Sequence, residues 1–164
     1  MRARRGQRGF TLAEVACVVG ISGVLAGLFA VAGVQAKKAS DRHRAQAGVA
    51  AIEAAIHSFQ VKRSAFPRDV NGDGVTRADE ILEQLKGWRV LEQSFSPLDP
   101  WGNPYVVVLK RDYGVSSETV LDYNLYPVNE TPDGFQVYSK GPDGKTGYMY
   151  TEETSVDNIG NYRT

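Results

Sequence analysis

Cysteine is almost absent from this sequence of 164 residues, which contains only Cys17. A single cysteine cannot form a disulfide within the chain, and it cannot build a metal site of the CxxC type. Histidine is scarce too, since His43 and His57 are the only two. The sequence also has no GxSxG motif, no HExxH motif and no phosphate-binding P-loop. We therefore expect that the chain is not an enzyme.

An excess of one charge is also missing, because 19 basic residues balance 19 acidic ones. The first nine residues are the exception, with four arginines and no acid. The remainder is mildly acidic and shows no basic face interleaved with aromatic residues, which is what nucleic-acid binding would require. We expect no nucleic-acid partner.

A stretch without any charge, residues 15–34, follows the arginine-rich start. As a helix it would span about 30 Å, the thickness of a bilayer's hydrocarbon core. The arginines predict that its start stays on the cytoplasmic side of a membrane. A secretory signal peptide is the alternative, because AVAGVQA at residues 30–36 offers small residues for cleavage. Glu14 weighs against this alternative, since an acid in an apolar run is costly and usually has a partner.

The residues around Glu14, RGFTLAEV, closely resemble the processing site of type IV prepilins and type II secretion pseudopilins. The resemblance implies that a prepilin peptidase cuts between Gly9 and Phe10, and that the new N-terminus at Phe10 is methylated. Glu14 would then be the fifth residue of the mature chain, where the family pairs a glutamate with the N-terminus of a neighbouring subunit. A buried charge pair is favourable only when both charges are present, so Glu14 would favour the assembled state.

The apolar run continues into a polar stretch in which apolar residues recur every three or four positions. This period predicts an amphipathic helix that ends before Pro67. We expect one helix from Phe10 to about Lys62, with residues 10–35 as its membrane and assembly half and residues 36–66 as the soluble half. The apolar stripe of the soluble half consists of Ala45, Val49, Ile52, Ile56 and Phe59.

Residues 69–80, DVNGDGVTRADE, match the calcium-binding loop of EF-hand proteins at each specified position. Oxygen atoms at alternating positions of such a loop surround the cation, and the twelfth position supplies a glutamate. Thr76 is the expected N-cap of the short helix that follows. An ordinary surface turn rich in Asp, Asn and Gly is the alternative interpretation. The candidate ligands are Asp69, Asn71, Asp73, Val75 through its carbonyl, and Glu80.

Three segments rich in β-branched and aromatic residues predict strands, at residues 105–111, 119–126 and 134–141. Turn-forming residues separate these segments. We expect an antiparallel meander in chain order that packs on the long helix.

Three motifs in the second half, DPWGNPY, YSKGPDGK and DNIGNY, resemble in this order the globular domain of the major pseudopilins of type II secretion. The resemblance implies a closing loop that binds calcium through acidic side chains and backbone carbonyls. Carried over by position, it assigns Asp143, Asp157 and Asn158 to a second candidate calcium loop, with Asn158 where the family often has aspartate.

The expected fold class is therefore α+β, a pilin-like fold in which a long N-terminal helix packs on a small antiparallel sheet with calcium loops. Residues 1–9 would be a cleaved leader and residues 67–164 the globular domain. The resemblance implies a filament subunit of the bacterial inner membrane, with a cytoplasmic N-terminus and a periplasmic C-terminal domain, that assembles into a pseudopilus.

The partners that the resemblance implies are further copies of the chain, minor pseudopilins, the prepilin peptidase, an inner-membrane assembly platform and the membrane itself. Two alternatives stay open. The chain could be a subunit of a type IV or competence pilus, or a membrane-anchored calcium-binding module that forms no filament.

Overall fold

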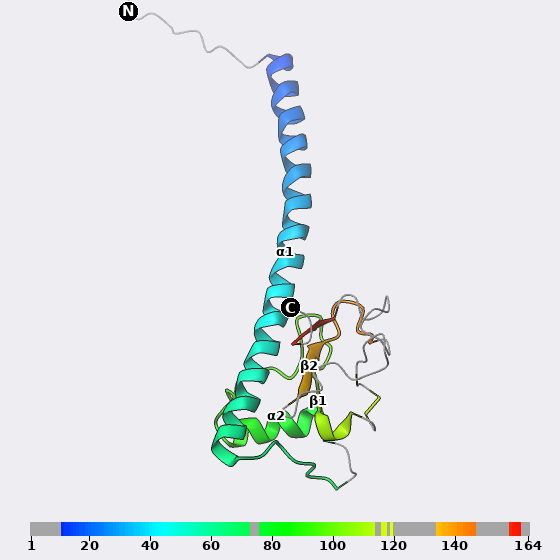
Figure 1. Cartoon of the computed structure of the whole chain (residues 1–164). Helices are drawn as coiled ribbons and strands as arrows, with labels where there is room; N and C mark the ends of the chain where they lie inside the picture. Colours follow the sequence, from blue (N-terminus) through cyan, green and yellow to red (C-terminus); the bar gives the residue numbers. More distant parts are fainter. Residues whose placement is uncertain are drawn as a thin grey trace, which may run out of the picture. The chain divides into compact units, whose positions relative to one another are not determined.

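The structure is a computed structural model that describes residues 11–72, 76–113, 116–117, 119, 134–146 and 158–161. The chain divides into two compact units, Met1–Ala39 and Ser40–Thr164, and each is described by itself. The elements, coloured along the chain in Figure 1, are α1 (Leu12–Arg63), α2 (Ala78–Gly87), β1 (Val106–Leu109), the 3-10 turn η1 (Lys110–Asp112), β2 (Phe135–Ser139) and β3 (Ile159–Gly160).

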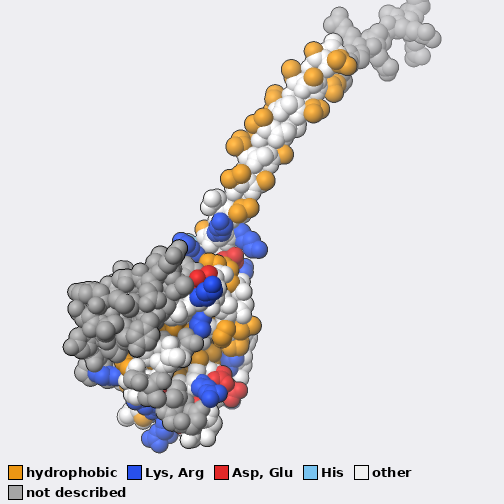
Figure 2. Space-filling model, turned by 90° about the vertical axis from the view of Figure 1, so that its right-hand side faces the viewer, with side chains coloured by type: hydrophobic (Ala, Val, Ile, Leu, Met, Phe, Trp, Pro, Cys, Tyr) orange, Lys and Arg blue, Asp and Glu red, His pale blue; other side chains and the backbone are white. Residues whose placement is uncertain are grey.

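The described part of the first unit is the apolar half of α1. By length and composition α1 could cross a membrane, and none of its most apolar window is buried against other parts of the chain. Its large side chains are exposed, from Leu12 at 90% to Phe29 at 75% and Val34 at 56%. Figure 2 shows hydrophobic side chains along the visible face of this helix. A helix that is apolar all round requires lipid or other helices to cover it.

In the second unit, α1 packs through the stripe that its sequence period predicts. Residues 45–63 present small and branched apolar side chains on one face, and the polar residues occupy the other faces. The main core joins this face to α2, β1 and β2. The five predicted stripe residues, Ala45, Val49, Ile52, Ile56 and Phe59, are all buried, each at most 5% exposed. The predicted amphipathic helix is confirmed.

Gly48 lies on the buried face of α1 for a steric reason. A Cβ atom at this position would be 2.0 Å from the hydroxyl oxygen of Tyr105, which is far inside contact distance. Tyr105 is itself only 4% exposed. The tyrosine ring therefore lies directly on the helix backbone, a contact that only glycine allows.

The soluble end of α1 is fixed by its last turn. The amide of Ser64 donates a 2.7 Å hydrogen bond to the carbonyl of Gln60, and Ser64 has a φ of 51°. A left-handed residue immediately after the last turn is a common way to end a helix. The helix thus ends at Arg63, four residues before Pro67, in the segment where the sequence predicts its end.

The sheet has three antiparallel strands in the order β1-β2-β3. Val107 pairs with Val137, and Ser139 pairs with Ile159. Because β1 pairs directly with β2, residues 119–126 cannot lie between them, so the meander in chain order is wrong. The third strand comes instead from the DNIGNY motif. Of residues 119–126 themselves, only Thr119 lies within the described residues.

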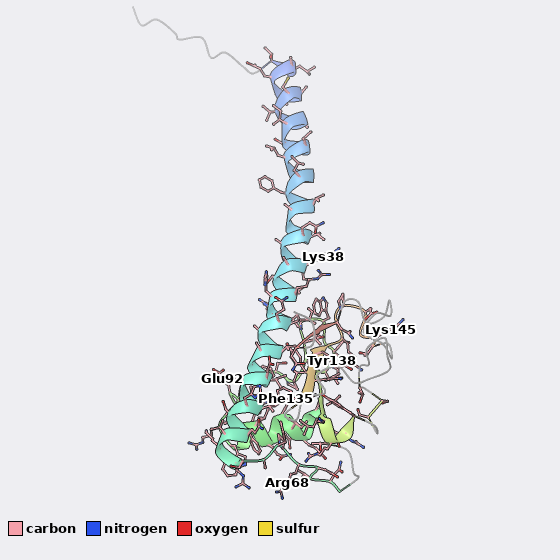
Figure 3. The ribbon with its side chains drawn as sticks, viewed as in Figure 1. Lys38, Arg68, Glu92, Phe135, Tyr138 and Lys145 are labelled. Atoms are coloured by element: carbon pink, nitrogen blue, oxygen red, sulfur yellow. The ribbon has the colours of Figure 1, made fainter. Side chains whose placement is uncertain are left out.

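Both faces of the sheet are buried. Alternate side chains of a strand point to opposite faces. Val107, Leu109, Phe135 and Val137 belong to the main core with α1. A second cluster, Val106, Val108, Tyr113 and Tyr138, forms on the other face. Figure 3 labels Phe135 and Tyr138, which represent the two faces of β2.

Candidate functional site

Glu14 is positioned by the first turn of α1. Its Oε2 atom accepts hydrogen bonds from the backbone amide of Thr11, at 2.8 Å, and from the Thr11 hydroxyl, at 2.9 Å. The Glu14 amide in turn donates to the Thr11 hydroxyl at 3.3 Å. This reciprocal arrangement is a capping box, which satisfies amides that have no partner within the helix. Gly9 and Phe10 lie outside the described residues.

Three of the five candidate ligands of the first calcium loop, Asp69, Asn71 and Glu80, lie within the described residues. The Asp69 Oδ1 atom accepts a 2.7 Å hydrogen bond from the Gly72 amide, and Asn71 is exposed beside it. The Oε2 atom of Glu80 is buried and has no hydrogen-bond partner among the described residues. A buried carboxylate oxygen without a partner is costly, and a cation is one group that would satisfy it. Asp73 and Val75 lie outside the described residues.

The first end of this loop is tied to α2 by Gln84. The Gln84 side chain accepts from the Arg68 amide at 3.0 Å and donates to the Arg68 carbonyl at 2.6 Å. It also donates to the carbonyl of Glu80 at 3.3 Å. One side chain thus holds the loop's first end beside the helix that carries Glu80.

The other end is held by η1. Arg111 Nη2 donates to the Pro67 carbonyl and, at 2.6 Å, to the Thr76 hydroxyl, while the buried Asp112 accepts a 3.3 Å hydrogen bond from the Thr76 amide. The predicted N-cap role of Thr76 is therefore wrong. Helix α2 begins at Ala78 after Arg77, which makes no side-chain capping bond. The sequence predicts a local partner for Thr76, but η1 supplies partners 35 and 36 residues away.

The second candidate loop contains a turn at residues 141–144 between β2 and Lys145. Asp143 is exposed, and its Oδ1 atom accepts a 2.8 Å hydrogen bond from the Lys145 amide. Asn158 is only 3% exposed. With its amide nitrogen turned toward the backbone carbonyls of the turn, it donates to Lys145 at 3.2 Å and to Lys140 at 3.3 Å. Asp157 lies outside the described residues. The fold brings Asp143 and Asn158 to the same turn.

The DPWGNPY motif makes hydrogen bonds to this turn and to the end of β2. The buried carboxylate of Asp99 accepts from the amides of Trp101 and Asn103, at 3.0 and 2.8 Å, and from the Ser139 hydroxyl, at 2.6 Å. The Asn103 side chain donates to the carbonyl of Gly141 at 2.8 Å. The resemblance of these motifs to one family thus corresponds to a contact between them.

Burial raises the pKa of Tyr105, and the negative charge of Asp99 raises it further. Both causes oppose formation of a second negative charge at the phenol oxygen. The ring that lies on Gly48 therefore stays neutral through the physiological range.

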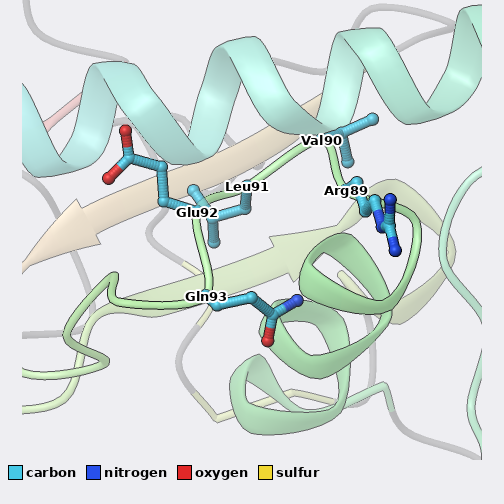
Figure 4. A pocket seen from close by; sticks show the side chains of 5 residues that line it. All are labelled: Arg89, Val90, Leu91, Glu92 and Gln93. Carbon is cyan, nitrogen blue, oxygen red and sulfur yellow. The ribbon is translucent and has the colours of Figure 1, made fainter.

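A shallow pocket of about 580 Å³ lies beside α1 and is lined by residues 89–93. In Figure 4 the side chains of Arg89 and Glu92 point to opposite ends of it. Gln93 donates to the Lys86 carbonyl at 2.8 Å. Charged groups that point apart do not form an acid–base pair. Across the described part of the chain, no three His, Cys, Asp or Glu side chains gather as metal ligands.

Residues 4–30 match the prokaryotic N-terminal methylation motif, and residues 33–120 match the protein G family of the type II secretion system. The methylation motif and a long N-terminal helix on a small antiparallel sheet define the class as prepilin-like. The second match covers more than half of the chain. The chain belongs to the type II secretion system protein G family.

Relatives with known names agree with this assignment. The chain is 30% identical to the type II secretion system core protein G of Pseudomonas aeruginosa, over 88% of this chain and 89% of that protein. It is 28% identical to the core protein G of Escherichia coli, over 90% of both chains. The crystal structure of the major pseudopilin of enterohaemorrhagic Escherichia coli is 17% identical and covers 80% of this chain and 94% of that chain, with a TM-score of 0.41.

Proposed function

We propose that the chain is the major pseudopilin subunit of a type II secretion system, which assembles into a periplasmic pseudopilus that drives protein export. The observation that carries this proposal is the fully exposed apolar half of α1, preceded by a methylation motif. Such a surface is compatible with two environments, lipid and a bundle of identical helices. A subunit that passes from membrane to filament uses both. The proposed role is structural and requires no catalysis by this chain.

Glu14 is the proposed pairing residue for assembly. Cleavage between Gly9 and Phe10 would leave an ammonium group one residue before Thr11, whose amide and hydroxyl hold the Glu14 carboxylate. The capping box therefore keeps the acid at the end of α1 that carries the new charge. In an apolar surrounding an unpaired carboxylate is costly, so pairing with a neighbour's N-terminus would favour assembly.

The location and partners follow from the same proposal. The apolar half of α1 would hold the subunit in the inner membrane, with the arginine-rich start in the cytoplasm and the second unit in the periplasm. The prepilin peptidase would remove residues 1–9, and an inner-membrane assembly platform would lift the subunit into a filament of identical copies capped by minor pseudopilins.

The proposal is tested by filament assembly in cells that carry the secretion system. Filaments are sheared, pelleted and quantified for Glu14→Ala, with Ser22→Ala as the control because Ser22 is another exposed polar residue of the apolar half. We expect that Glu14→Ala abolishes pelleted filaments while Ser22→Ala leaves them unchanged. Wild-type amounts of filament from Glu14→Ala would show that the pairing account is wrong.

We propose in addition that residues 69–80 bind calcium. Three points support this proposal: the spacing of the oxygen-bearing residues, the hydrogen bond that bends the chain at Asp69, and the unpartnered buried oxygen of Glu80. Asp69, Asn71, Asp73, the carbonyl of Val75 and Glu80 would hold the cation, which would supply positive charge among otherwise repelling oxygens. In the second candidate loop, the side chain of Asn158 lies between the backbone carbonyls of Lys140 and Lys145.

A further inference from the structure

The side chain of Asn158 lies between the two ends of the turn at residues 141–144, which follows β2. Its side chain is almost fully buried, and one end of its amide group lies within hydrogen-bond distance of the carbonyls of Lys140 and Lys145. With the nitrogen at that end, the amide donates to both carbonyls. These carbonyls belong to the two ends of the turn. The orientation of the amide follows from its neighbours, because the opposite one would direct its oxygen at two carbonyl oxygens. Figure 3 labels Lys145 in this turn.

The sheet determines where Asn158 lies. Ser139 pairs with Ile159 in the antiparallel ladder between β2 and β3, and Asn158 is the residue immediately before Ile159. The register therefore places Asn158 beside Lys140. Strand pairing alone is therefore enough to place it there.

Three further polar groups of the turn have partners within the described part of the chain. The Gly141 amide donates to the Ser139 hydroxyl at 3.1 Å, and the Gly141 carbonyl accepts from Asn103 at 2.8 Å. The Lys145 amide donates to the Asp143 carboxylate at 2.8 Å. The protein itself therefore satisfies these three groups.

We infer that the Asn158 amide closes this turn in the way a bound cation would, and that the turn holds its shape without calcium. A primary amide has two N–H donors, which is the number needed for two carbonyls. A cation between the same carbonyls would occupy the space of the amide nitrogen. The residues present therefore fit a hydrogen-bonded lock at Asn158 that closes the turn without a cation.

Replacing Asn158 with aspartate should make the shape of the turn depend on calcium. The carboxylate of Asn158→Asp would direct an acceptor oxygen at the carbonyls of Lys140 and Lys145, and a buried arrangement of acceptors alone is costly. A calcium ion, which takes carboxylate and carbonyl oxygens as ligands, would relieve the repulsion. The substitution should therefore make the turn depend on calcium.

The test measures the melting temperature of the full-length protein in detergent by circular dichroism, with chelator and with millimolar calcium. The starting protein carries Asp69→Asn, Asp73→Asn and Glu80→Gln, so all three candidate carboxylate ligands of the first loop are removed. In this background the melting temperature should be the same with and without calcium. Adding Asn158→Asp should lower it in chelator by on the order of 5 °C, and calcium should restore it while magnesium should not.

Two results would overturn the inference. One is a rise in melting temperature with calcium while Asn158 is intact, which would show that the second loop already binds the ion. The other is an unchanged melting temperature for Asn158→Asp in chelator, which would show that the amide does not hold the turn. Asn158→Ala checks the lock separately, because it should destabilise the protein equally with and without calcium. This inference does not depend on the proposed calcium site at residues 69–80.

Discussion

Gly48 has less room for a side chain than the other described glycines for which a neighbour is found, because the Tyr105 hydroxyl would be 2.0 Å from its Cβ. The Tyr105 ring lies where any side chain at position 48 would have to be. This contact fixes how closely the strand region can approach α1. It is the residue at which a single methyl group should have the largest effect.

Gly48→Ala should lower the free energy of unfolding by about 1–3 kcal/mol, the usual cost of forcing extra volume into a packed site. Gly87→Ala is the control, because Gly87 is also helical but has open space around its would-be Cβ. There the gain in helix propensity should leave stability unchanged or slightly higher. Urea unfolding of both variants measures the difference, and equal stabilities would contradict the contact.

Tyr105 also predicts a pH dependence. Its pKa is raised in the folded protein by burial and by Asp99, so the unfolded chain loses the phenol proton at lower pH than the folded chain does. The stability contributed by the neutral ring is complete below the unfolded pKa of about 10 and is lost as pH rises through the folded pKa. Unfolding of wild type and Tyr105→Phe across alkaline pH measures this loss. The loss should be smaller in Tyr105→Phe, and parallel curves would contradict it.

At this scale the sequence predicts the buried stripe of α1 but not the need for Gly48. Periodicity shows which face of a helix is buried, and the five predicted residues are indeed buried. It does not show which residue lies opposite, because Tyr105 is 57 positions away in the sequence. The capping box at Thr11 and Glu14 could have been predicted, since the T-x-x-E pattern is visible in the sequence.

At the scale of elements, η1 connects β1 to the candidate calcium loop. Arg111 donates hydrogen bonds to two groups that are distant in the sequence, the Pro67 carbonyl and the Thr76 hydroxyl. Both bonds come from Nη2, which lies one bond farther from the backbone than a lysine nitrogen does. Arg111 therefore contacts the chain on both sides of the segment that carries Asp69 and Asn71. We call these two hydrogen bonds the Arg111 clamp.

Arg111→Lys keeps the charge but should lose one of these contacts. We expect a loss of about 1–3 kcal/mol of stability and faster amide exchange in residues 68–72. Arg68→Lys is the control, since Arg68 is bound to Gln84 through its backbone. Hydrogen exchange followed by mass spectrometry measures the effect. Equal protection in the two variants would show that the clamp does not order the loop.

Calcium binding by residues 69–80 predicts a stabilisation that depends on Glu80. A ligand that binds only the folded state raises the free energy of unfolding by about 2.7 kcal/mol at one hundred times its dissociation constant. Glu80→Gln should remove most of this gain, while Glu83→Gln, an exposed acid of the same helix, should retain it. Thermal unfolding with and without calcium decides the matter, and a wild-type protein that does not respond would refute calcium binding here.

The sequence predicts whether a segment forms a helix or a strand better than it predicts which strands pair with each other. Residues 105–111 and 134–141 contain β1 and β2, as their β-branched content predicts. The predicted strand order is wrong because strand propensity does not specify which strand is the pairing partner. The third strand, Ile159–Gly160, is only two residues long and carries no strand pattern of its own. Its register with β2 determines it, and that is a tertiary effect.

At the scale of the whole molecule, the two units meet different physical demands. The apolar half of α1 has no core of its own and depends on its surroundings, lipid or neighbouring helices. The second unit buries its own core and satisfies the turn after β2 with its own side chains. One chain thereby combines a helix made for assembly with a domain that folds around its own contacts.

The account rests most directly on what happens to the first nine residues. Mass spectrometry of the N-terminal peptide, from protein made in cells with a prepilin peptidase, identifies the first residue of the mature chain and any methyl group on it. The account predicts a chain that begins with N-methylated Phe10 and keeps the whole apolar helix. A chain that begins near Gln35 or Ala36 would mean that the apolar run is a removed signal peptide, and it would contradict the account.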